Sequence, residues 1–425
     1  MSRLALPFAL VLLLAGCARK TETVVRFWGL GREGEEVKKL VPRFERLHPG
    51  VRVEVQQIPW TAAHEKLLTA LVGGAPPDVA QIGNTWIPEF AALGAVAPLD
   101  ERIARTPDFR PADFFGGIWR TNVIDGRVYG VPWYVDTRLL FYRKDMLAEV
   151  GFPEMPRTWS AWRTAMDRLK AKNGPDKFPI LLPKDEWQQP VALAQALGAT
   201  ILRDGGRYGA FRSPEVERAF SFLIGIYRAG LAPLVGREQV SNLYQDFAAG
   251  QFAIVITGPW NLGQFHDRLP PERQGDWATA PLPAPDGQPW PGAGVAGGAS
   301  LVLFRRTPVP EAAWAFLEFL SRPDMQAQLY RLTGDMPPRA SVWQATGLAR
   351  DPGAAAFARQ LEHVEPAPLV PEWEQICSKI PPALEEATRG ERPLEQILAD
   401  LDREVDQILE KRRWLLERNP HPHAF

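Results

Sequence analysis

The sequence of 425 residues has little cysteine, no excess of one charge and no long apolar run. Lys and Arg number 49 against 50 Asp and Glu, so the chain lacks the basic excess of a typical nucleic-acid-binding protein. Its apolar run from Leu4 to Leu14 is shorter than the about 20 residues of a transmembrane helix. With 45% hydrophobic and 23% charged residues, the composition is that of an ordinary globular protein of two or three domains.

The apolar run near the N-terminus has the features of an export signal. It follows Arg3 and ends in the sequence Leu14-Ala15-Gly16-Cys17, which resembles a bacterial lipoprotein signal with a small-residue site before a lipid-modified cysteine. We therefore expect residues 1–16 to be a signal peptide and Cys17 to be a lipid anchor. An ordinary signal peptide and a buried segment with a chance cysteine stay open as alternatives.

Cysteine is too scarce for a disulfide framework. If Cys17 carries lipid, Cys377 is the only remaining thiol, so no intramolecular disulfide can form. The core must then be stable without covalent cross-links.

Strand and helix patterns alternate along the chain, which predicts α/β architecture with a parallel sheet. In the first part, the strand patterns cover residues 24–28, 51–55 and 79–82, and the helical patterns cover 35–47, 62–72 and 86–93. A second set has strands within 131–142 and 253–256 and helices over 159–172, 192–197 and 214–229. A segment rich in Pro and Gly, residues 280–298, indicates a crossing between two bodies. It is followed by a strand over 301–304, helices over 311–321 and 324–333, and an amphipathic helix from Leu394 to Leu409.

Few motifs in the chain carry chemistry. Residues 29–34 fit the spacing G-x-G-x-x-G, with Glu54 twenty residues beyond Gly34. This spacing fits a dinucleotide fingerprint, but a glycine turn after a first strand serves any ligand near a helix N-terminus, and we favour that second interpretation. The histidines form no metal-binding motif, and no nucleophile motif is present, so we expect no metal, no cofactor and no catalytic residues. A carboxylate pair of a glycosidase stays open, because the separation of the two groups depends on the fold.

Tryptophan is unusually abundant, at 15 residues. Trp28, Trp86, Trp133, Trp187 and Trp260 each lie at the end of a predicted strand or in a loop beside one, where open α/β sheets bind ligands. An indole face suits the C–H face of a sugar ring, while carboxylates and amides suit its hydroxyl groups. We expect core packing for the tryptophans on helical stretches, Trp119, Trp159, Trp162 and Trp314.

The stretch from Gly130 to Asp145, GVPWYVDTRLLFYRKD, resembles the signature of the extracellular solute-binding proteins of ABC sugar importers. Matching motifs follow in order over nearly the whole mature chain: Pro77-Asp78-Val79, Asn84-Thr85-Trp86, Pro156-x-Thr158-Trp159, Phe247 to Gly250, Gly258-Pro259-Trp260, Gly297-Gly298 and Thr333 to Arg339. Individually these motifs are modest, but their order and spacing make the resemblance strong.

This resemblance implies an α/β periplasmic-binding-protein fold of class II, with a ligand cleft between two lobes joined by crossing hinge strands. The lobes of such proteins close on the ligand like a hinge. Residues 17–134 plus 299–348 would form the first lobe, and residues 135–298 plus 349–425 the second.

The resemblance also implies which residues would contact the ligand. From the first lobe and the crossing these are Trp28, Arg32, Asn84, Thr85, Trp86, Trp133, Tyr134 and Asp136, with the glycines Gly297 and Gly298. From the second lobe they are Trp187, Gln188, Trp260 and Trp373.

Three positions depart from the family pattern. Trp162 stands where an aliphatic residue is common, and we expect it only to fill the core. Arg143 stands where Asn is usual, which we expect to lie outside the cleft. Thr85 stands where the maltose-binding member has an acid, which argues against maltose itself as the ligand.

The function that the resemblance implies is capture of a sugar, with a di- or oligosaccharide favoured by the number of tryptophans, and its delivery to the transmembrane subunits of an ABC permease. We expect a monomer that is lipid-anchored in the periplasm or another extracytoplasmic space, and we expect neither an enzyme nor a nucleic-acid partner. A binding protein for glycerol phosphate or another charged solute, and a secreted glycosidase, are the alternative hypotheses.

Overall fold

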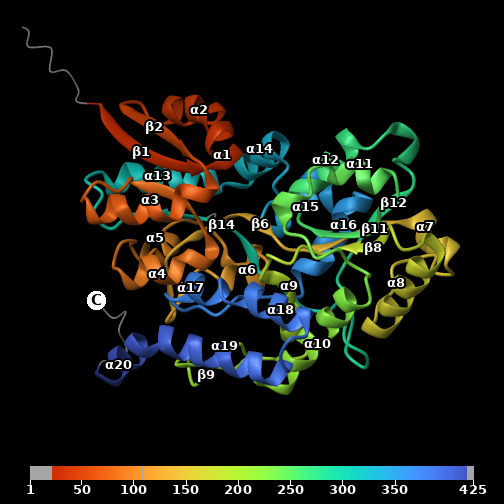
Figure 1. The fold of residues 1–425 in the computed structure, drawn as a ribbon. Helices are drawn as coiled ribbons and strands as arrows, with labels where there is room; N and C mark the ends of the chain where they lie inside the picture. The colour runs from red at the N-terminus through yellow and green to blue at the C-terminus, as the bar shows by residue number, and fades with distance from the viewer. Residues whose placement is uncertain (1–21, 108, 419–425) are drawn as a thin grey trace, which may run out of the picture.

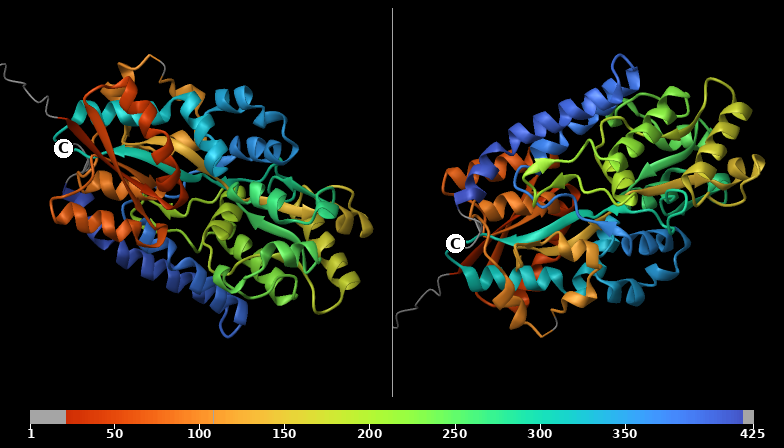
Figure 2. Two further views of the ribbon diagram at one scale, coloured as in Figure 1. Left: turned by 90° about the horizontal axis from the view of Figure 1, so that it is seen from above. Right: turned by 90° about the horizontal axis from the view of Figure 1, so that it is seen from below.

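Two α/β lobes, each built around its own β-sheet, lie side by side in the protein (Figures 1 and 2). The computed structural model describes residues 22–107 and 109–418. The expected signal peptide and the expected lipid anchor at Cys17 lie outside these residues.

The sheet of the first lobe has the strand order β2-β1-β3-β14-β6. Strands β1 and β2 pair in parallel from Thr23 opposite Val51 to Leu30 opposite Ile58, and β1 also pairs in parallel with β3. Strand β14 pairs antiparallel with both β3 and β6. The strands are β1 (Thr23–Leu30), β2 (Val51–Ile58), β3 (Val79–Gly83), β6 (Val131–Asp136) and β14 (Gly297–Leu303).

The sheet of the second lobe has the strand order β12-β7-β11-β8. Strands β8 and β11 are parallel, whereas β7 runs antiparallel to both of its neighbours. These strands are β7 (Leu139–Arg143), β8 (Phe178–Leu181), β11 (Phe252–Thr257) and β12 (Trp277–Ala280). The other strands are two residues long and form two-stranded sheets: β4 (Val123–Ile124) with β5 (Arg127–Val128), β9 (Leu202–Arg203) with β10 (Tyr208–Gly209), and β13 (Gly294–Val295) with β15 (Val364–Glu365).

Both sheets are therefore mixed, whereas the alternation of patterns predicted a parallel sheet. The difference comes from the connections between the lobes. Strand β6 leads directly into β7 of the other lobe, and β14 returns from the segment after β12, so these strands enter their sheets without the helical crossover that a parallel neighbour needs.

The helices of the first lobe flank its sheet, and in Figure 1 α13 lies beside β1. They are α1 (Gly31–Glu36), α2 (Val41–Leu47), α3 (Trp60–Val72), α4 (Ile87–Ala92), α5 (Asp100–Ala104), α6 (Gly116–Arg120), α13 (Pro310–Ser321) and α14 (Pro323–Thr333). Short 3₁₀ turns lie at η1 (Val37–Lys39), η2 (Asn84–Trp86) and η3 (Pro111–Asp113).

The first predicted helix, residues 35–47, is broken in the structure into α1, η1 and α2. Pro42 explains the break, because it has no N–H for the carbonyl of Lys38 and its ring crowds that carbonyl. The start is also earlier than predicted, since Gly31, with φ of +52°, begins α1 directly after β1.

The remaining helices belong mostly to the second lobe. Thr158 and Ser213 accept hydrogen bonds from Ala161 N and Val216 N and so cap α8 and α10, close to the predicted starts. The helices are α7 (Lys144–Glu149), α8 (Trp159–Asn173), α9 (Gln188–Ala196), α10 (Pro214–Arg228), α11 (Leu243–Ala248), α12 (Trp260–Arg268), α15 (Ala340–Thr346), α16 (Pro352–Leu361), α17 (Trp373–Cys377), α18 (Ile380–Arg389), α19 (Leu394–Ile408) and α20 (Glu410–Arg418). The 3₁₀ turns here are η4 (Arg237–Gln239), η5 (Pro271–Arg273) and η6 (Leu348–Arg350).

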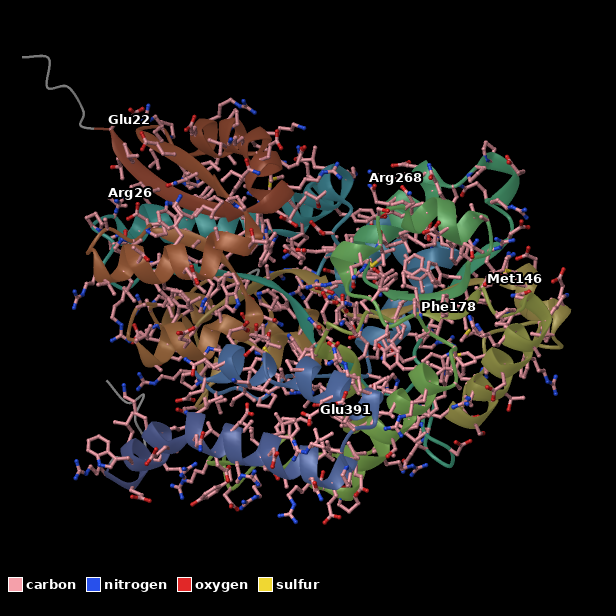
Figure 3. All side chains as sticks on the ribbon, viewed as in Figure 1. Glu22, Arg26, Met146, Phe178, Arg268 and Glu391 are labelled. Carbon is pink, nitrogen blue, oxygen red and sulfur yellow. The ribbon has the colours of Figure 1, made fainter. Side chains whose placement is uncertain are left out.

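Separate hydrophobic cores fill the two lobes, and Figure 3 shows Met146 and Phe178 among the side chains of the second. The helical tryptophans pack as predicted: Trp159 and Trp162 are buried in the second lobe, Trp314 is buried in the first, and Trp119 packs against the first-lobe core. Trp343 and Leu348 pack in the same core as Phe141 and Phe265.

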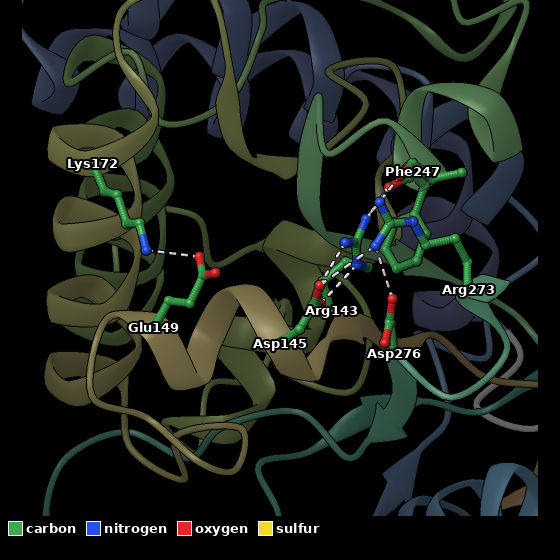
Figure 4. Close-up of polar contacts among 8 residues, drawn as sticks. Arg143, Asp145, Glu149, Lys172, Phe247, Arg273 and Asp276 are labelled. Carbon is green, nitrogen blue, oxygen red and sulfur yellow. Dashed lines mark hydrogen bonds and ion pairs between the residues drawn. The ribbon is translucent and has the colours of Figure 1, made fainter.

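Arg143, the departure from the family pattern, is buried in the second lobe (Figure 4). Its guanidinium donates to the carbonyls of Phe247 and Ala248 at 2.9 and 3.0 Å and to both carboxylate oxygens of Asp145. It therefore ties β7 to the C-terminal end of α11 and does not line the cavity between the lobes.

Candidate functional site

A cavity of about 450 Å³ lies between the two lobes. The first lobe and the crossing segments supply Glu33, Trp60, Gly83, Asn84, Thr85, Trp86, Tyr134, Val135, Asp136, Val295, Ala296, Gly297, Gly298 and Asp335. The second lobe supplies Arg138, Trp187, Gln188, Arg237, Trp260 and Glu374.

Most of the residues that the family resemblance implied line this cavity. They are Asn84, Thr85, Trp86, Tyr134, Asp136, Trp187, Gln188, Trp260, Gly297 and Gly298. They converge because η2 follows β3, Asp136 ends β6, and Trp187 and Trp260 precede or begin helices of the second lobe.

Four of the implied residues lie outside the cavity. Trp133 is buried in the first-lobe core with its ring edge against Phe27, because alternate residues of β6 point to opposite faces. Trp373 is buried behind Trp187, with ring centroids 5.1 Å apart, so it supports that indole from the protein side. Trp28 packs against the first-lobe core below Lys66, and Arg32 donates to the carbonyl of Leu332 at 2.9 Å.

The backbone at Gly297 and Gly298 comes very close to strand β6. A Cβ atom at Gly297 would lie 2.2 Å from the carbonyl oxygen of Asp136, and one at Gly298 would lie 2.3 Å from that of Tyr134. Gly298 also has φ of +136°. Only glycine allows this approach, which brings the two crossing strands together at the cavity.

Four indoles line the cavity from both lobes. Trp60 and Trp86 come from the first lobe with ring centroids 5.8 Å apart, and Trp187 and Trp260 come from the second. Trp60 and Trp260 are 37% and 39% exposed, so both present surface to a ligand. The sequence interpretation missed Trp60, although it follows the end of a predicted strand just as the other candidates do.

Arg138 holds a network of charges on the second-lobe side of the cavity. Its guanidinium donates to Asp136 and Glu186 and stacks on Trp260 at 4.6 Å from the ring centroid. Burial alone would lower the pKa of Arg138, but the charges of Asp136 and Glu186 outweigh it and raise that pKa. Arg237 lies 3.5 Å from Glu186 as well. Both cavity arginines are therefore engaged by carboxylates.

Glu33 and Asp335 form a different kind of charged group on the first-lobe side. Both carboxyls are buried and line the cavity, and no ion pair with a cation is found for either among the described residues. Burial, followed by the neighbouring Glu33, raises the pKa of Asp335 well above its ordinary range. Burial and the charges of Glu33, Asp335 and Asp136 also raise the pKa of Tyr134. Glu33 belongs to the glycine motif and Asp335 to the Thr333–Arg339 motif, but the sequence did not predict either residue as part of the site.

Two hydrogen bonds fix η2 of the first lobe at the cavity, one to a crossing segment and one to the second lobe. Thr85 Oγ1 donates to Glu374 Oε1 on α17 at 2.6 Å, and Asn84 Nδ2 donates to the carbonyl of Ala296 at 2.9 Å. Because Glu374 belongs to a helix packed in the second lobe, the Thr85 bond bridges the two lobes directly.

The glycine motif serves packing between β1 and α1. A Cβ atom at Gly34 would lie 2.4 Å from the carbonyl oxygen of Gly29, so the strand and the helix are in backbone contact there. Glu54, the acid expected of a dinucleotide site, lies in the middle of β2 and pairs with Arg52. The position and pairing of Glu54 argue against a dinucleotide fingerprint, and a ligand at the N-terminus of α1 stays a prediction.

Among residues 22–107 and 109–418, no group of three or more His, Cys, Asp or Glu side chains is arranged to hold a metal ion. Within the same residues, no helix has both the length and the apolar character needed to cross a membrane.

Known proteins with similar sequences and structures bind solutes. The sugar-binding protein MalE from the phytopathogen Xanthomonas citri is 46% identical, with a TM-score of 0.89 over 93% of this chain and 100% of that one. The diacetylchitobiose-binding protein DasA of Streptomyces coelicolor is 26% identical over 85% of this chain and 82% of its own. The maltotriose-binding protein of Pyrococcus abyssi is 25% identical over 87% and 78% of the two chains.

The model of the family described as bacterial extracellular solute-binding protein matches residues 28–327, which is more than half of the chain. This match confirms the resemblance found in the sequence, and the two-lobe α/β fold agrees with it. The chain belongs to the bacterial extracellular solute-binding protein family.

Proposed function

We propose that the protein is the sugar-binding component of an ABC importer, that its ligand is a di- or oligosaccharide, and that it performs no chemistry on that ligand. The observation that carries the proposal is the cavity between the lobes, where four indoles face carboxylates and amides. Indole faces pack on the C–H faces of sugar rings, and the polar groups bind hydroxyls. The names of the similar proteins, which bind sugars, support the same assignment.

The charges of the cavity argue against glycerol phosphate or another anionic solute. Arg138 and Arg237 are the cations among the described lining residues, and both are paired with carboxylates. Glu33, Asp335 and Glu374 add further acidic groups. A phosphate would have to displace these carboxylates from the arginines, whereas a neutral sugar can bind to the groups as they stand.

The carboxyl arrangement also argues against a glycosidase. Glycosidases hold their two carboxyls roughly 5–9.5 Å apart on either side of the glycosidic bond. Here the Glu33 and Asp335 carboxyls lie within hydrogen-bonding reach of each other, Asp136 is bound to Arg138, and Glu374 accepts from Thr85. None of these arrangements provides a general acid opposite a free nucleophile.

We further propose the setting in which this receptor works. Residues 1–16 would be removed, Cys17 would carry lipid, and the monomer would present its closed form to the transmembrane subunits of the permease from the periplasm or another extracytoplasmic space. Mass spectrometry of the N-terminal peptide from membranes tests this, since an unmodified Cys17 would contradict it.

The first experiment is a thermal-shift screen of the purified protein without residues 1–16 against mono- and disaccharides, glycerol phosphate and amino acids. A ligand that binds only the folded state raises the unfolding midpoint by mass action. We expect a clear shift with one or two disaccharides, which chromatography should recover unhydrolysed. A shift with glycerol phosphate alone, or recovery of cleaved sugar, would contradict the proposal.

A matched pair of tryptophan variants controls the screen. Trp260→Ala should abolish most of the sugar-dependent shift, whereas Trp414→Ala should leave it intact, because Trp414 is 49% exposed but does not line the cavity.

A further inference from the structure

Glu33 and Asp335 come together at the wall of the cavity from distant parts of the chain. Glu33 lies on α1, and Asp335 follows α14 in the segment that crosses to α15 of the second lobe. Glu33 and Asp335 are each 7% exposed, and both line the cavity. The pair therefore lies at the wall of the cavity and beside one of the crossings between the lobes.

The two carboxyl groups face each other without a donor between them. Within the described residues, Glu33 Oε2 and Asp335 Oδ2 are buried and have no hydrogen-bond partner. Asp335 nevertheless has the Glu33 carboxyl within hydrogen-bonding reach. Because two carboxylates are both acceptors, only a proton between them turns this contact into a hydrogen bond.

Among the residues that the structure describes, no cation forms an ion pair with either carboxyl. From α1, Arg32 is directed away and donates to the carbonyl of Leu332. From β6, Tyr134 and Asp136 face the pair, and Asp136 adds negative charge although Arg138 is bound to it. From the end of α14, the Thr333 hydroxyl accepts from the backbone N–H of Asp335 at 3.1 Å, and its hydrogen bond with the Asp335 carboxyl lowers that pKa by less than burial and Glu33 raise it. Two buried like charges with such surroundings cost more than one protonated pair.

We propose that Glu33 and Asp335 share one proton, that Asp335 donates it to Glu33, and that ligand binding depends on this proton. The pair then carries a single negative charge. The second carboxylate oxygen of Glu33 is left as an acceptor for a ligand hydroxyl. This inference rests on the proposed function only where it concerns the ligand, since the shared proton belongs to the free protein.

The affinity for the ligand should depend on pH, because the charge of the pair changes when the shared proton is lost. Loss of the shared proton at high pH would place two adjacent carboxylates at the cavity, and closure of the lobes over a neutral ligand would remove their remaining water. The dissociation constant is therefore expected to rise with pH once the pair ionises, by up to tenfold per pH unit for one proton. Below that pH it should be constant.

Infrared spectroscopy of the ligand-free protein tests the proton itself. At neutral pH we expect a carboxylic-acid C=O band, which disappears when the shared proton is titrated. Asp335→Asn and Glu33→Gln should each remove it. Asp145→Asn is the matched control and should leave the band unchanged, because the Arg143 guanidinium holds that aspartate ionised against the effect of its burial.

The outcomes separate this inference from the proposed function. No acid band in the wild type, or a band that both variants retain, overturns the shared proton whatever the ligand. If one variant does not fold, the other variant still tests the shared proton.

The pH dependence of binding is measured with the disaccharide that gives the largest thermal shift. Calorimetry from pH 5 to about 9 should show that the affinity of the wild type weakens and that the affinity of Asp335→Asn does not. A constant affinity in the wild type, with the band present, would overturn the dependence of binding on the proton. A failed sugar screen would overturn the proposed function and leave the infrared result standing.

Discussion

Asp335 and Asp145 are two aspartates on which burial acts in the same direction, yet their pKa values move oppositely. Asp335 lies in the cavity with Glu33 as its nearest charged partner, and burial together with Glu33 raises its pKa. Asp145 lies in the second lobe, where burial would also raise the pKa but the hydrogen bonds and charge of Arg143 lower it (Figure 4). The partner, and not the burial alone, decides the charge state.

The comparison separates a structural use of charge from a functional one. Arg143 satisfies Asp145 and two backbone carbonyls and so holds the second lobe together. The cavity leaves the Glu33–Asp335 pair without such a partner, and an unpartnered group is available to a ligand.

The first prediction, with the strongest effect on stability, removes from Asp145 the arginine that Asp335 lacks. Arg143→Met removes the guanidinium, leaves the carbonyls of Phe247 and Ala248 without it, and leaves Asp145 with only the more distant Arg273 as a cationic partner. We expect a loss of about 3 kcal/mol in the free energy of unfolding, the low end for a broken buried pair because Asp145 is partly exposed. Urea denaturation measures it. The control Arg273→Met removes a half-buried cation 4.0 Å from the same aspartate and should cost far less, and equal losses would contradict the comparison.

The second prediction concerns stability against pH. The folded pKa of Asp335 is raised, so its contribution is fully present below the ordinary value of 3.8 and is lost as pH rises toward the folded pKa. Wild type relative to Asp335→Asn should lose about 1.4 kcal/mol per pH unit across that window. For Asp145, whose pKa is lowered, wild type relative to Asp145→Asn should lose stability as pH falls below 3.8. Chemical denaturation at several pH values checks both slopes, and slopes of the same sign would refute the comparison.

The third prediction concerns the cation side of the cavity. Trp260→Ala should weaken sugar binding at least tenfold, which is about 1.4 kcal/mol, because the indole covers Arg138 and offers its exposed face to the ligand. Stability should change little, since the ring is 39% exposed. Calorimetric titration gives the affinity, and an unchanged Kd would remove Trp260 from the site.

The fourth prediction, with the weakest effect, concerns the carboxylate of Glu374, whose partner is the neutral hydroxyl of Thr85. Thr85→Val removes the 2.6 Å hydrogen bond to Glu374 that bridges the lobes, at a cost of about 1 kcal/mol to the bridged arrangement. We expect roughly fivefold weaker binding. Thr85→Ser, which keeps the hydroxyl, should retain the wild-type affinity in the same titration, and a Ser variant as weak as Val would exclude the hydrogen bond as the cause.

Much of the fold could be predicted from the sequence because its patterns act locally. The helices near 159–172 and 311–321 form within a few residues of their predicted ends, since apolar spacing and capping residues act over one or two turns. The family was recognisable because its motifs occur in order along the chain. The mixed sheets were not predicted, because strand order depends on how the two lobes exchange strands.

Which aromatic and acidic residues lie near strand ends can be read from the sequence, but the packing of the whole chain sets which of them share a cavity. Trp133 and Tyr134 are adjacent, yet the pleat of β6 sends the first into the core and the second to the cavity. Glu33 and Asp335 meet only because α1 and the segment after α14 pack together. A proton shared between residues so distant in the chain is a property of that packing, since local sequence carries no record of contacts made across the fold.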